Sequence, residues 1–185
     1  MTPSILYYIQ GRHTKRRINM ITLIQNADQY RSNIAIQSGG KAYTYSELLN
    51  RSASIAAALL GEKTDLNEER IAFIVDPGYD YTAIQWGIWR AGGIAVPLCI
   101  KHPLASIRYV VEDTKASVVI YTADYAELIS PLSDIANLQM LPLMNISDST
   151  GVLPDVDLTR RAMILYTSGT TGLPKGVVTT HANIE

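Results

Sequence analysis

A glycine-rich stretch near the C-terminal end, residues 166–176, has the composition of a loop that holds phosphate groups. Gly169, Gly172 and Gly176 would let the backbone turn tightly and bring amide N–H groups close to an anion. Hydroxyl groups add neutral hydrogen-bond donors, and a lysine adds a mobile positive charge. The phosphate-binding candidates are therefore Thr167, Ser168, Gly169, Thr170, Thr171, Gly172 and Lys175.

The flanking residues must position this stretch. An apolar run at 162–166 predicts a buried strand that leads into the loop, and residues 177–180 predict a second strand directly after it. Such a composition also occurs in flexible connectors. The continuous leading strand and Pro174, which stiffens the exit of the loop, favour a tight connection instead. The stretch is not a Walker A loop, because that motif needs Ser or Thr where Gly176 follows Lys175.

The same residues carry a family resemblance. The run at 164–177, followed by Thr180-His181-x-Asn183, resembles the phosphate-binding signature of the AMP-forming adenylating enzymes. That superfamily holds acyl-CoA synthetases, adenylation domains of peptide synthetases and luciferases. Two weaker matches lie upstream in the expected order: residues 43–48 resemble its TYxEL element, and residues 89–98 its AGxxxVPL element. The resemblance covers residues 21–185.

A closer resemblance is visible within the superfamily. Residues 87–98, with Lys101-His102-Pro103, Tyr109-Val110-x-x-Asp113 and 117–119, resemble the malonyl-CoA synthetase branch, the branch of acyl-CoA synthetase family member 3. These segments pack the core of the fold and do not touch the acyl group directly. They therefore indicate a short-chain acid as substrate only through the branch that they resemble.

The resemblance implies a two-step reaction that uses ATP, Mg²⁺ and CoA. A carboxylate attacks the α-phosphate of ATP to give acyl-AMP and pyrophosphate, and the CoA thiol then displaces AMP. The implied task of the loop is to hold the β- and γ-phosphates while charge builds on the departing pyrophosphate. The implied partners are ATP and a carboxylic acid.

The sequence stops at Glu185, a few residues into a predicted helix, before the parts that this family uses for the base, the acyl group and the catalytic lysine of its C-terminal domain. We therefore expect an inactive N-terminal fragment with no catalytic residue of its own. The alternative is a non-catalytic binding or assembly module that keeps the fold. In both, a sheet that ends early predicts self-association through uncovered edges.

Composition fits one globular unit. The 185 residues are 47% hydrophobic and 18% charged, and 16 basic residues against 17 acidic ones give a net charge of -1. That balance argues against nucleic acid as a partner, and no apolar stretch approaches the ~20 residues of a membrane span. The single cysteine, Cys99, is interpreted as a small core residue rather than a nucleophile, which is compatible with a reducing cytosol.

The N-terminal residues differ from the rest. Residues 1–19 are predicted to be a poorly ordered extension, with Met20 as an alternative start, and residues 20–185 to be the subdomain. The extension has basic residues at 12 and 15–17 and no acidic residue before Asp28, which weakly resembles a transit peptide. A cytoplasmic location is predicted, with organelle targeting as the alternative.

The remaining pattern predicts an α/β fold with a doubly wound, mostly parallel sheet, the N-terminal subdomain of the acyl-CoA synthetase fold. Helices are expected at 21–30, 45–60, 79–91, 103–114 and 124–132. A hairpin is expected at 34–45, and strands at 71–75, 94–98, 116–121 and 138–141. Thr44 and Glu47 form a capping-box signature, and Gly61 is placed to end that helix.

Isolated reactive side chains are given structural interpretations. His102 is predicted to be a loop residue, and His181 to cap a helix or make a structural hydrogen bond rather than to act as an acid or base. Trp86 and Trp89, three residues apart on a predicted helix, are interpreted as core. The histidines are scattered and Cys99 stands alone, so no metal site is predicted.

Overall fold

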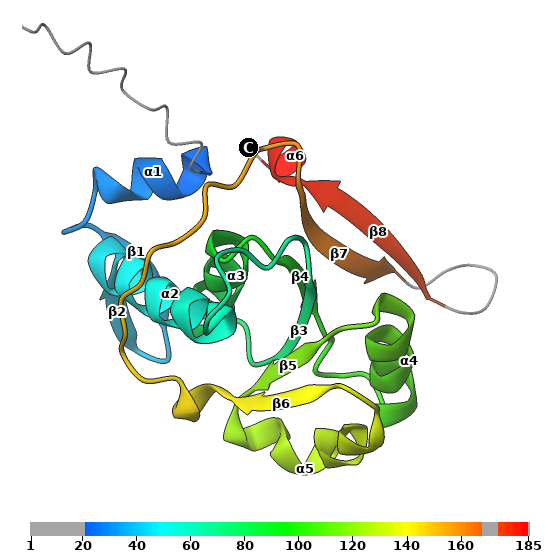
Figure 1. The fold of residues 1–185 in the computed structure, drawn as a ribbon. Helices are drawn as coiled ribbons and strands as arrows, with labels where there is room; N and C mark the ends of the chain where they lie inside the picture. Colours follow the sequence, from blue (N-terminus) through cyan, green and yellow to red (C-terminus); the bar gives the residue numbers. More distant parts are fainter. Residues whose placement is uncertain (1–20, 168–173, 185) are drawn as a thin grey trace, which may run out of the picture.

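The computed structural model describes residues 21–167 and 174–184, which form an α/β fold around a six-stranded sheet. The strand order is β6-β5-β3-β4-β7-β8, and β1 pairs with β2 in a separate two-stranded sheet (Figure 1). All neighbours in the large sheet are parallel except β7 and β8, which are antiparallel. The predicted extension at 1–19 lies outside the described residues.

The large sheet contains strands β3 (Arg70–Ile74), β4 (Ile94–Pro97), β5 (Val118–Tyr121), β6 (Gln139–Pro142), β7 (Arg161–Thr167) and β8 (Lys175–Thr180). The separate sheet contains β1 (Ile34–Ser38) and β2 (Lys41–Thr44). The α-helices are α1 (Thr22–Asp28), α2 (Tyr45–Leu60), α3 (Tyr79–Arg90), α4 (Leu104–Thr114), α5 (Ala126–Ile129) and α6 (His181–Ile184). The predicted order of elements is therefore confirmed, with most bounds within two residues.

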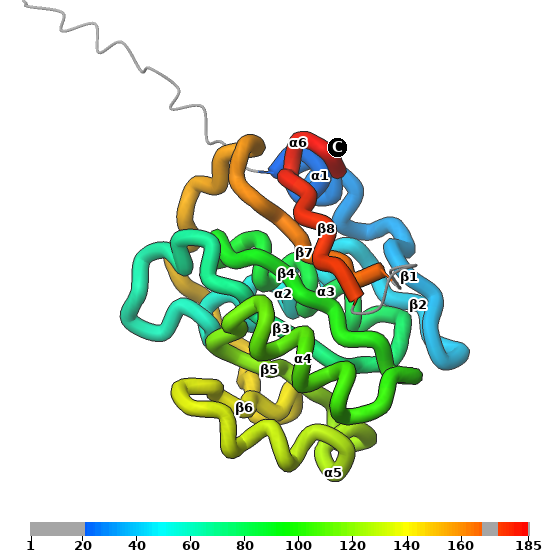
Figure 2. Tube along the Cα trace, turned by 90° about the vertical axis from the view of Figure 1, so that its right-hand side faces the viewer, coloured from blue at the N-terminus to red at the C-terminus, as the bar shows by residue number. Residues whose placement is uncertain are grey.

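Alternation along β3 shows why helices must cover both faces of the sheet. Ile71 and Phe73 belong to one hydrophobic cluster, whereas Ala72 and Ile74 belong to another. The first cluster includes side chains of α1, α2 and α3, and the second includes side chains of α4 and α5. A strand buried on both faces reads as a continuous apolar run, as this one does. The doubly wound prediction is confirmed (Figure 2).

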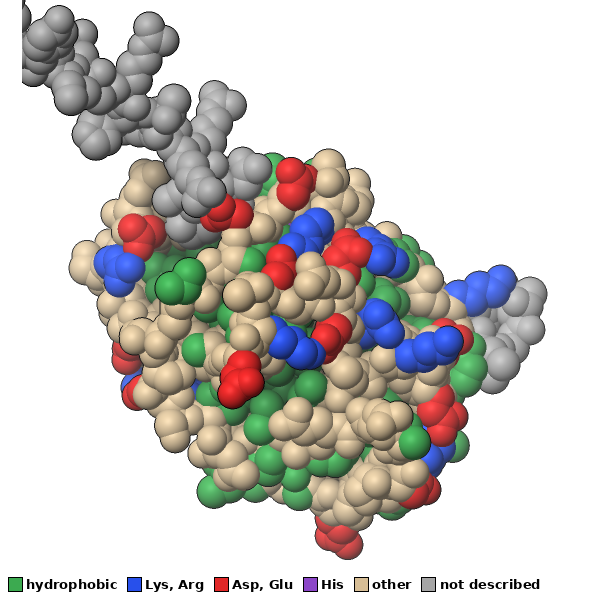
Figure 3. All heavy atoms as spheres, viewed as in Figure 1, with side chains coloured by type: hydrophobic (Ala, Val, Ile, Leu, Met, Phe, Trp, Pro, Cys, Tyr) green, Lys and Arg blue, Asp and Glu red, His purple; other side chains and the backbone are tan. Residues whose placement is uncertain are grey.

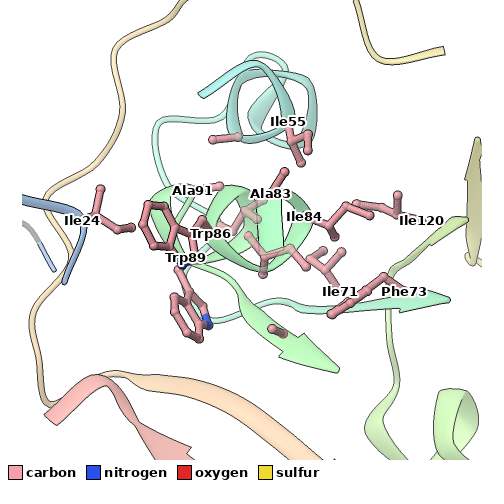
Figure 4. Close-up of a cluster of buried hydrophobic side chains, with 14 of the residues drawn as sticks. Ile24, Ile55, Ile71, Phe73, Ala83, Ile84, Trp86, Trp89, Ala91 and Ile120 are labelled. Atoms are coloured by element: carbon pink, nitrogen blue, oxygen red, sulfur yellow. The ribbon is translucent and has the colours of Figure 1, made fainter. Parts of the chain in front are cut away.

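The first cluster is built around α3, which lies between α2 and the sheet (Figure 4). Ile55 of α2 packs on the helix from one side, and Ile71 and Phe73 lie toward it from β3. Trp86 is 6% exposed and Trp89 is 3% exposed, so both tryptophans belong to the core as predicted. Helix α1 also joins this cluster through Ile24.

The capping box of α2 is present as predicted. The Thr44 hydroxyl accepts a hydrogen bond from the Glu47 backbone N–H, and the Glu47 carboxylate accepts one from the Thr44 backbone N–H. The bond from the Thr44 backbone N–H lowers the pKa of the Glu47 carboxylate, and a bond that the Thr44 hydroxyl donates to the same carboxylate lowers that pKa further. Gly61 follows the last turn, with a φ of 52°. The local sequence therefore sets both ends of this helix.

Two predictions from the middle of the chain need correction. The helix expected at 124–132 is three short pieces: a 3₁₀ turn at Ala123–Tyr125, α5 at Ala126–Ile129 and a 3₁₀ helix at Ser130–Asp134. Pro131 lies in the first turn of the last piece, where it fits because that turn needs no donor from it. Cys99 is exposed rather than buried, because the chain has left the sheet after β4.

No helix among the described residues is long and apolar enough to cross a membrane. The face seen in Figure 3 carries acidic and basic side chains intermixed over its surface. That mixing agrees with the nearly balanced composition.

Candidate functional site

The candidate site lies at the tip of the hairpin formed by β7 and β8. Thr167, the last residue of β7, pairs with Lys175, the first residue of β8. Such antiparallel partners have Cα atoms about 4.5–5.5 Å apart, so their side chains are neighbours. Both residues are exposed. The other candidates, Ser168, Gly169, Thr170, Thr171 and Gly172, lie outside the described residues.

The direction of β7 decides at which edge of the sheet this tip lies. Ala95 of β4 pairs with Met163 of β7 in parallel register, so both strands end at the same edge. β3 and β5 run parallel to β4 and end there too. In open α/β sheets, ligands bind beyond the carboxyl ends of the strands. The topology therefore places Thr167 at the edge where a ligand is expected.

Helix α4 supports the tip from one side of the hairpin. The Tyr166 hydroxyl donates a hydrogen bond to the Asp113 carboxylate. Burial raises the pKa of Tyr166, and the hydrogen bond to Asp113 raises it further, so the phenol keeps its proton. Tyr109 meets the Tyr166 ring edge-on, with the ring centroids 6.2 Å apart.

The start of β7 and the residue before it contact the rest of the protein. The Arg160 guanidinium bonds both oxygens of Asp65, at 2.7 and 2.9 Å. Arg161 pairs with Glu68 at 2.5 Å. The Trp89 indole N–H donates to the Ala162 carbonyl at 2.8 Å. These contacts join β7 to the loop before β3 and to α3.

His181 lies at the far end of the hairpin from the loop. It is 1% exposed, and its ring meets the Trp89 ring edge-on at 5.5 Å between centroids. Asn183, rather than His181, caps the turn: its side-chain oxygen accepts hydrogen bonds from the Thr180 backbone N–H and hydroxyl. His181 is thus a core residue and belongs to the support of the hairpin. His102 lies in the loop after β4, as predicted.

Charge at the tip favours an anionic ligand. Lys175 forms no ion pair with any residue that the structure describes. Its ammonium group can therefore face a phosphate without first leaving a carboxylate. Within residues 21–167 and 174–184, no group of three or more His, Cys, Asp or Glu side chains could hold a metal ion.

Sequence reasoning missed the part that α4 plays at the tip. It noted Tyr109 and Asp113 only as core-packing residues of a motif. Their spacing of four residues puts both on one face of a helix, which was a usable signal. What the spacing could not show is that this face meets β7.

Known proteins match this chain over most of its length. The family described as "AMP-binding enzyme" matches residues 23–185. The mitochondrial malonate–CoA ligase of Homo sapiens is 38% identical over 164 residues, which are 82% of this chain and 28% of that protein. The malonate–CoA ligase of Arabidopsis thaliana is 30% identical over 179 residues, 82% of this chain and 29% of the relative.

Solved structures share the fold. The NpsA N-terminal subdomain of Klebsiella oxytoca gives a TM-score of 0.73 at 21% identity and covers 89% of this chain and 41% of that one. A putative long-chain-fatty-acid CoA ligase of Rhodopseudomonas palustris gives 0.77 at 18% identity, covering 89% and 44%. The chain thus spans less than a third of the two malonate–CoA ligases and less than half of these two structures.

Proposed function

Because the chain belongs to the AMP-binding enzyme family, we propose that its residues 20–185 are the N-terminal subdomain of an AMP-forming acid–thiol ligase. In the proposed reaction a carboxylate oxygen attacks the α-phosphorus of ATP, and pyrophosphate leaves. The sulfur of CoA then attacks the acyl carbon, and AMP leaves. The mixed anhydride made in the first step is thus consumed in the second.

The pairing of Thr167 with Lys175 is the observation that carries this proposal. It sets a hydroxyl and a positive charge side by side at the mouth of the glycine-rich loop. Negative charge grows on the β- and γ-phosphates as pyrophosphate leaves, and donors that are already in place stabilise that charge without reorganising. Mg²⁺ bound to the nucleotide would neutralise part of the same charge.

Malonate or another short-chain acid is the proposed carboxylate. The proposal is supported by relatives in two kingdoms that are named malonate–CoA ligases. A groove of about 650 Å³ lies away from the hairpin tip, between α2, the start of α3 and residues 148–150. We infer that the acid is selected by residues outside this chain, and that the chain alone does not turn over.

A chimera tests the proposed role of Lys175. Residues 23–185 would replace the matching segment of the human malonate–CoA ligase, and pyrophosphate release would be measured with ATP, Mg²⁺ and malonate. Lys175→Ala should lower the rate of adenylation by about 10²–10³ and leave the malonate KM close to that of the parent chimera. Lys63→Ala, which removes an exposed lysine of another loop, is the control.

Unchanged pyrophosphate release by the Lys175→Ala chimera contradicts the phosphate-binding role. The isolated 185-residue chain should release no pyrophosphate above background with ATP and a panel of carboxylates. Turnover by that chain would contradict its proposed incompleteness. The alternative function, a binding or assembly module, is favoured by the exposed apolar side chains of the hairpin. Self-association of the chain through these side chains would support it.

A further inference from the structure

We propose that α4 positions the phosphate-binding hairpin through three residues, Tyr166, Asp113 and Tyr109. In this proposal they hold the strand ends that present Thr167 and Lys175, and they act as positioning residues. The inference rests on the proposed function for what these two ends bind. The contacts of these three residues between α4 and the hairpin form a tie, and its existence can be tested without any ligand.

The contacts reach both sides of the loop. Tyr166 comes directly before Thr167, and its hydroxyl donates to Asp113 on the last turn of α4. On the other side, the Tyr109 hydroxyl donates to the carbonyl of Pro174, directly before Lys175, at 3.4 Å. The second bond is long and therefore weak. Together they connect the end of β7 and the start of β8 to one face of one helix.

The position of Asp113 is unfavourable for the helix by itself. Asp113 is the next-to-last residue of α4, which ends at Thr114. A carboxylate in the last turn is repelled by the negative end of the helix dipole. A donor from outside the helix offsets this repulsion, and the Tyr166 hydroxyl is that donor. The residue thus serves a contact between elements rather than the stability of α4.

The hairpin has little other support near its tip. Among the strands that the structure describes, β8 pairs only with β7, and its first four residues are exposed. Gly176 lies close to the Tyr166 ring: a Cβ added there would come within 3.2 Å of Tyr166 Cζ and 3.0 Å of Ile164 Cγ2. The Tyr166 ring is therefore the surface on which the start of β8 rests.

Fixing this ring should fix Lys175 before a ligand arrives. A lysine on a firmly held strand loses less conformational freedom on binding than one on a fraying strand, because the backbone part of that cost has already been met in folding. Removing the contacts from α4 should therefore weaken phosphate binding. It should change the overall stability only by the modest net value of one hydrogen bond.

Trypsin can measure the tie directly, because it cleaves after Lys175 only when the start of β8 opens. The full 185-residue chain would be digested under conditions in which reclosing is fast, so that the rate reports the open population. Tyr166→Phe and Asp113→Ala should each speed cleavage after Lys175 by about fivefold, the effect of one hydrogen bond of about 1 kcal/mol. The double variant should be no faster than either single one.

Two controls separate the tie from general loosening. Asp113→Asn keeps a side-chain oxygen that can accept the hydrogen bond from the Tyr166 hydroxyl. The rate of cleavage after Lys175 in this variant should therefore stay near that of the unmodified chain. Cleavage after Lys41, in the separate β1–β2 sheet, should not change in any variant. Equal acceleration at Lys41 and Lys175, or no acceleration at Lys175, overturns the proposal.

Repeating the digestion with Mg²⁺ and tripolyphosphate distinguishes this inference from the proposed function. In the unmodified chain tripolyphosphate should slow cleavage after Lys175, and Tyr166→Phe should need about fivefold more of it for equal protection. If tripolyphosphate protects no variant while Tyr166→Phe and Asp113→Ala still speed cleavage after Lys175, the tie is supported. In that case the proposal that the hairpin tip binds phosphate fails. If protection occurs but Tyr166→Phe behaves like the unmodified chain in both assays, the tie fails.

Discussion

Position 92 requires glycine for two reasons, its backbone conformation and the close packing of its neighbours. Its φ is +79°, in the left-handed region that favours glycine. A Cβ at this position would collide with Asp65 Oδ1 and come within 2.8 Å of Arg160 Nη2. The Gly92 carbonyl also accepts a hydrogen bond from Arg160 at 2.5 Å. This part of the AGxxxVPL element therefore makes room for the ion pair that holds the start of β7.

Gly92→Ala should destabilise the protein by about 2 kcal/mol or more, because it adds backbone strain and displaces the Asp65–Arg160 pair. Urea unfolding followed by circular dichroism measures the loss. Gly151→Ala is the matched control, since its Cβ would meet only Ala57 Cβ at 3.7 Å, an ordinary contact. If the two variants unfold at the same urea concentration, the steric argument for Gly92 is wrong.

At the scale of elements, α2 shows how a local signal sets a helix. Its start depends on the reciprocal bonds between Thr44 and Glu47, and its inner face carries Leu48, Leu49 and Ile55 into the core. The cap satisfies backbone donors that the first turn leaves without intrahelical partners. The buried face then fixes the helix on α3.

Thr44→Ala should lower the free energy of unfolding by about 1 kcal/mol, the usual effect of losing an N-cap side chain. The midpoint of urea unfolding measures it. Thr64→Ala, at an exposed loop position, should leave the midpoint where it is. A Thr44→Ala midpoint equal to that of the unmodified chain would mean that packing alone defines the start of α2.

At the scale of the whole molecule, two ion pairs close the chain on itself. Asp65 pairs with Arg160, and Glu68 with Arg161, across more than ninety residues of sequence. Burial acts to raise the pKa of Asp65, but hydrogen bonds from Arg160 and the Asn67 backbone outweigh it and lower that pKa. The hydrogen bond from Arg161 lowers the pKa of Glu68.

A carboxylate with a lowered folded-state pKa stabilises the protein above its unfolded pKa of about 4. That stability is lost as the pH falls through the folded-state pKa. The free energy of unfolding should therefore decrease between pH 5 and pH 3, and Asp65→Asn should show lower stability at pH 7 and a smaller decrease. Glu62→Gln, at an exposed position, is the control. If Asp65→Asn leaves the pH dependence of the free energy of unfolding unchanged, the Asp65 carboxylate does not supply this stability.

The free edge of the large sheet predicts self-association. Leu165, Val177 and Val178 are 38%, 49% and 51% exposed, and β8 has no partner on its outer side among the described strands. Exposed edges with apolar side chains pair with other chains. Sedimentation velocity should show a concentration-dependent oligomer, which Val178→Lys weakens. Val152→Lys, 95% exposed in a loop, should not weaken it. A monomer at every concentration contradicts the prediction.

Patterns within a few residues determined much of this protein. Alternating apolar runs and helical spacings predicted the strands and helices, and the Thr44 to Glu47 spacing predicted the capping box, because such features depend on neighbours along the chain. The glycine-rich stretch and the upstream motifs indicated the family, which the match over residues 23–185 confirms. The phosphate-binding assignment of Thr167, residues 168–172 and Lys175 stays a prediction.

Contacts between distant residues were decided by the tertiary structure alone. No local pattern shows that Asp113 meets Tyr166, or that Asp65 closes over Gly92 onto Arg160, because each pair joins segments far apart in sequence. Cys99 has the composition of a core residue, yet the end of β4 leaves it exposed. Sequence spacing fixes which face of an element a side chain occupies. Only the packing of elements decides what that face meets.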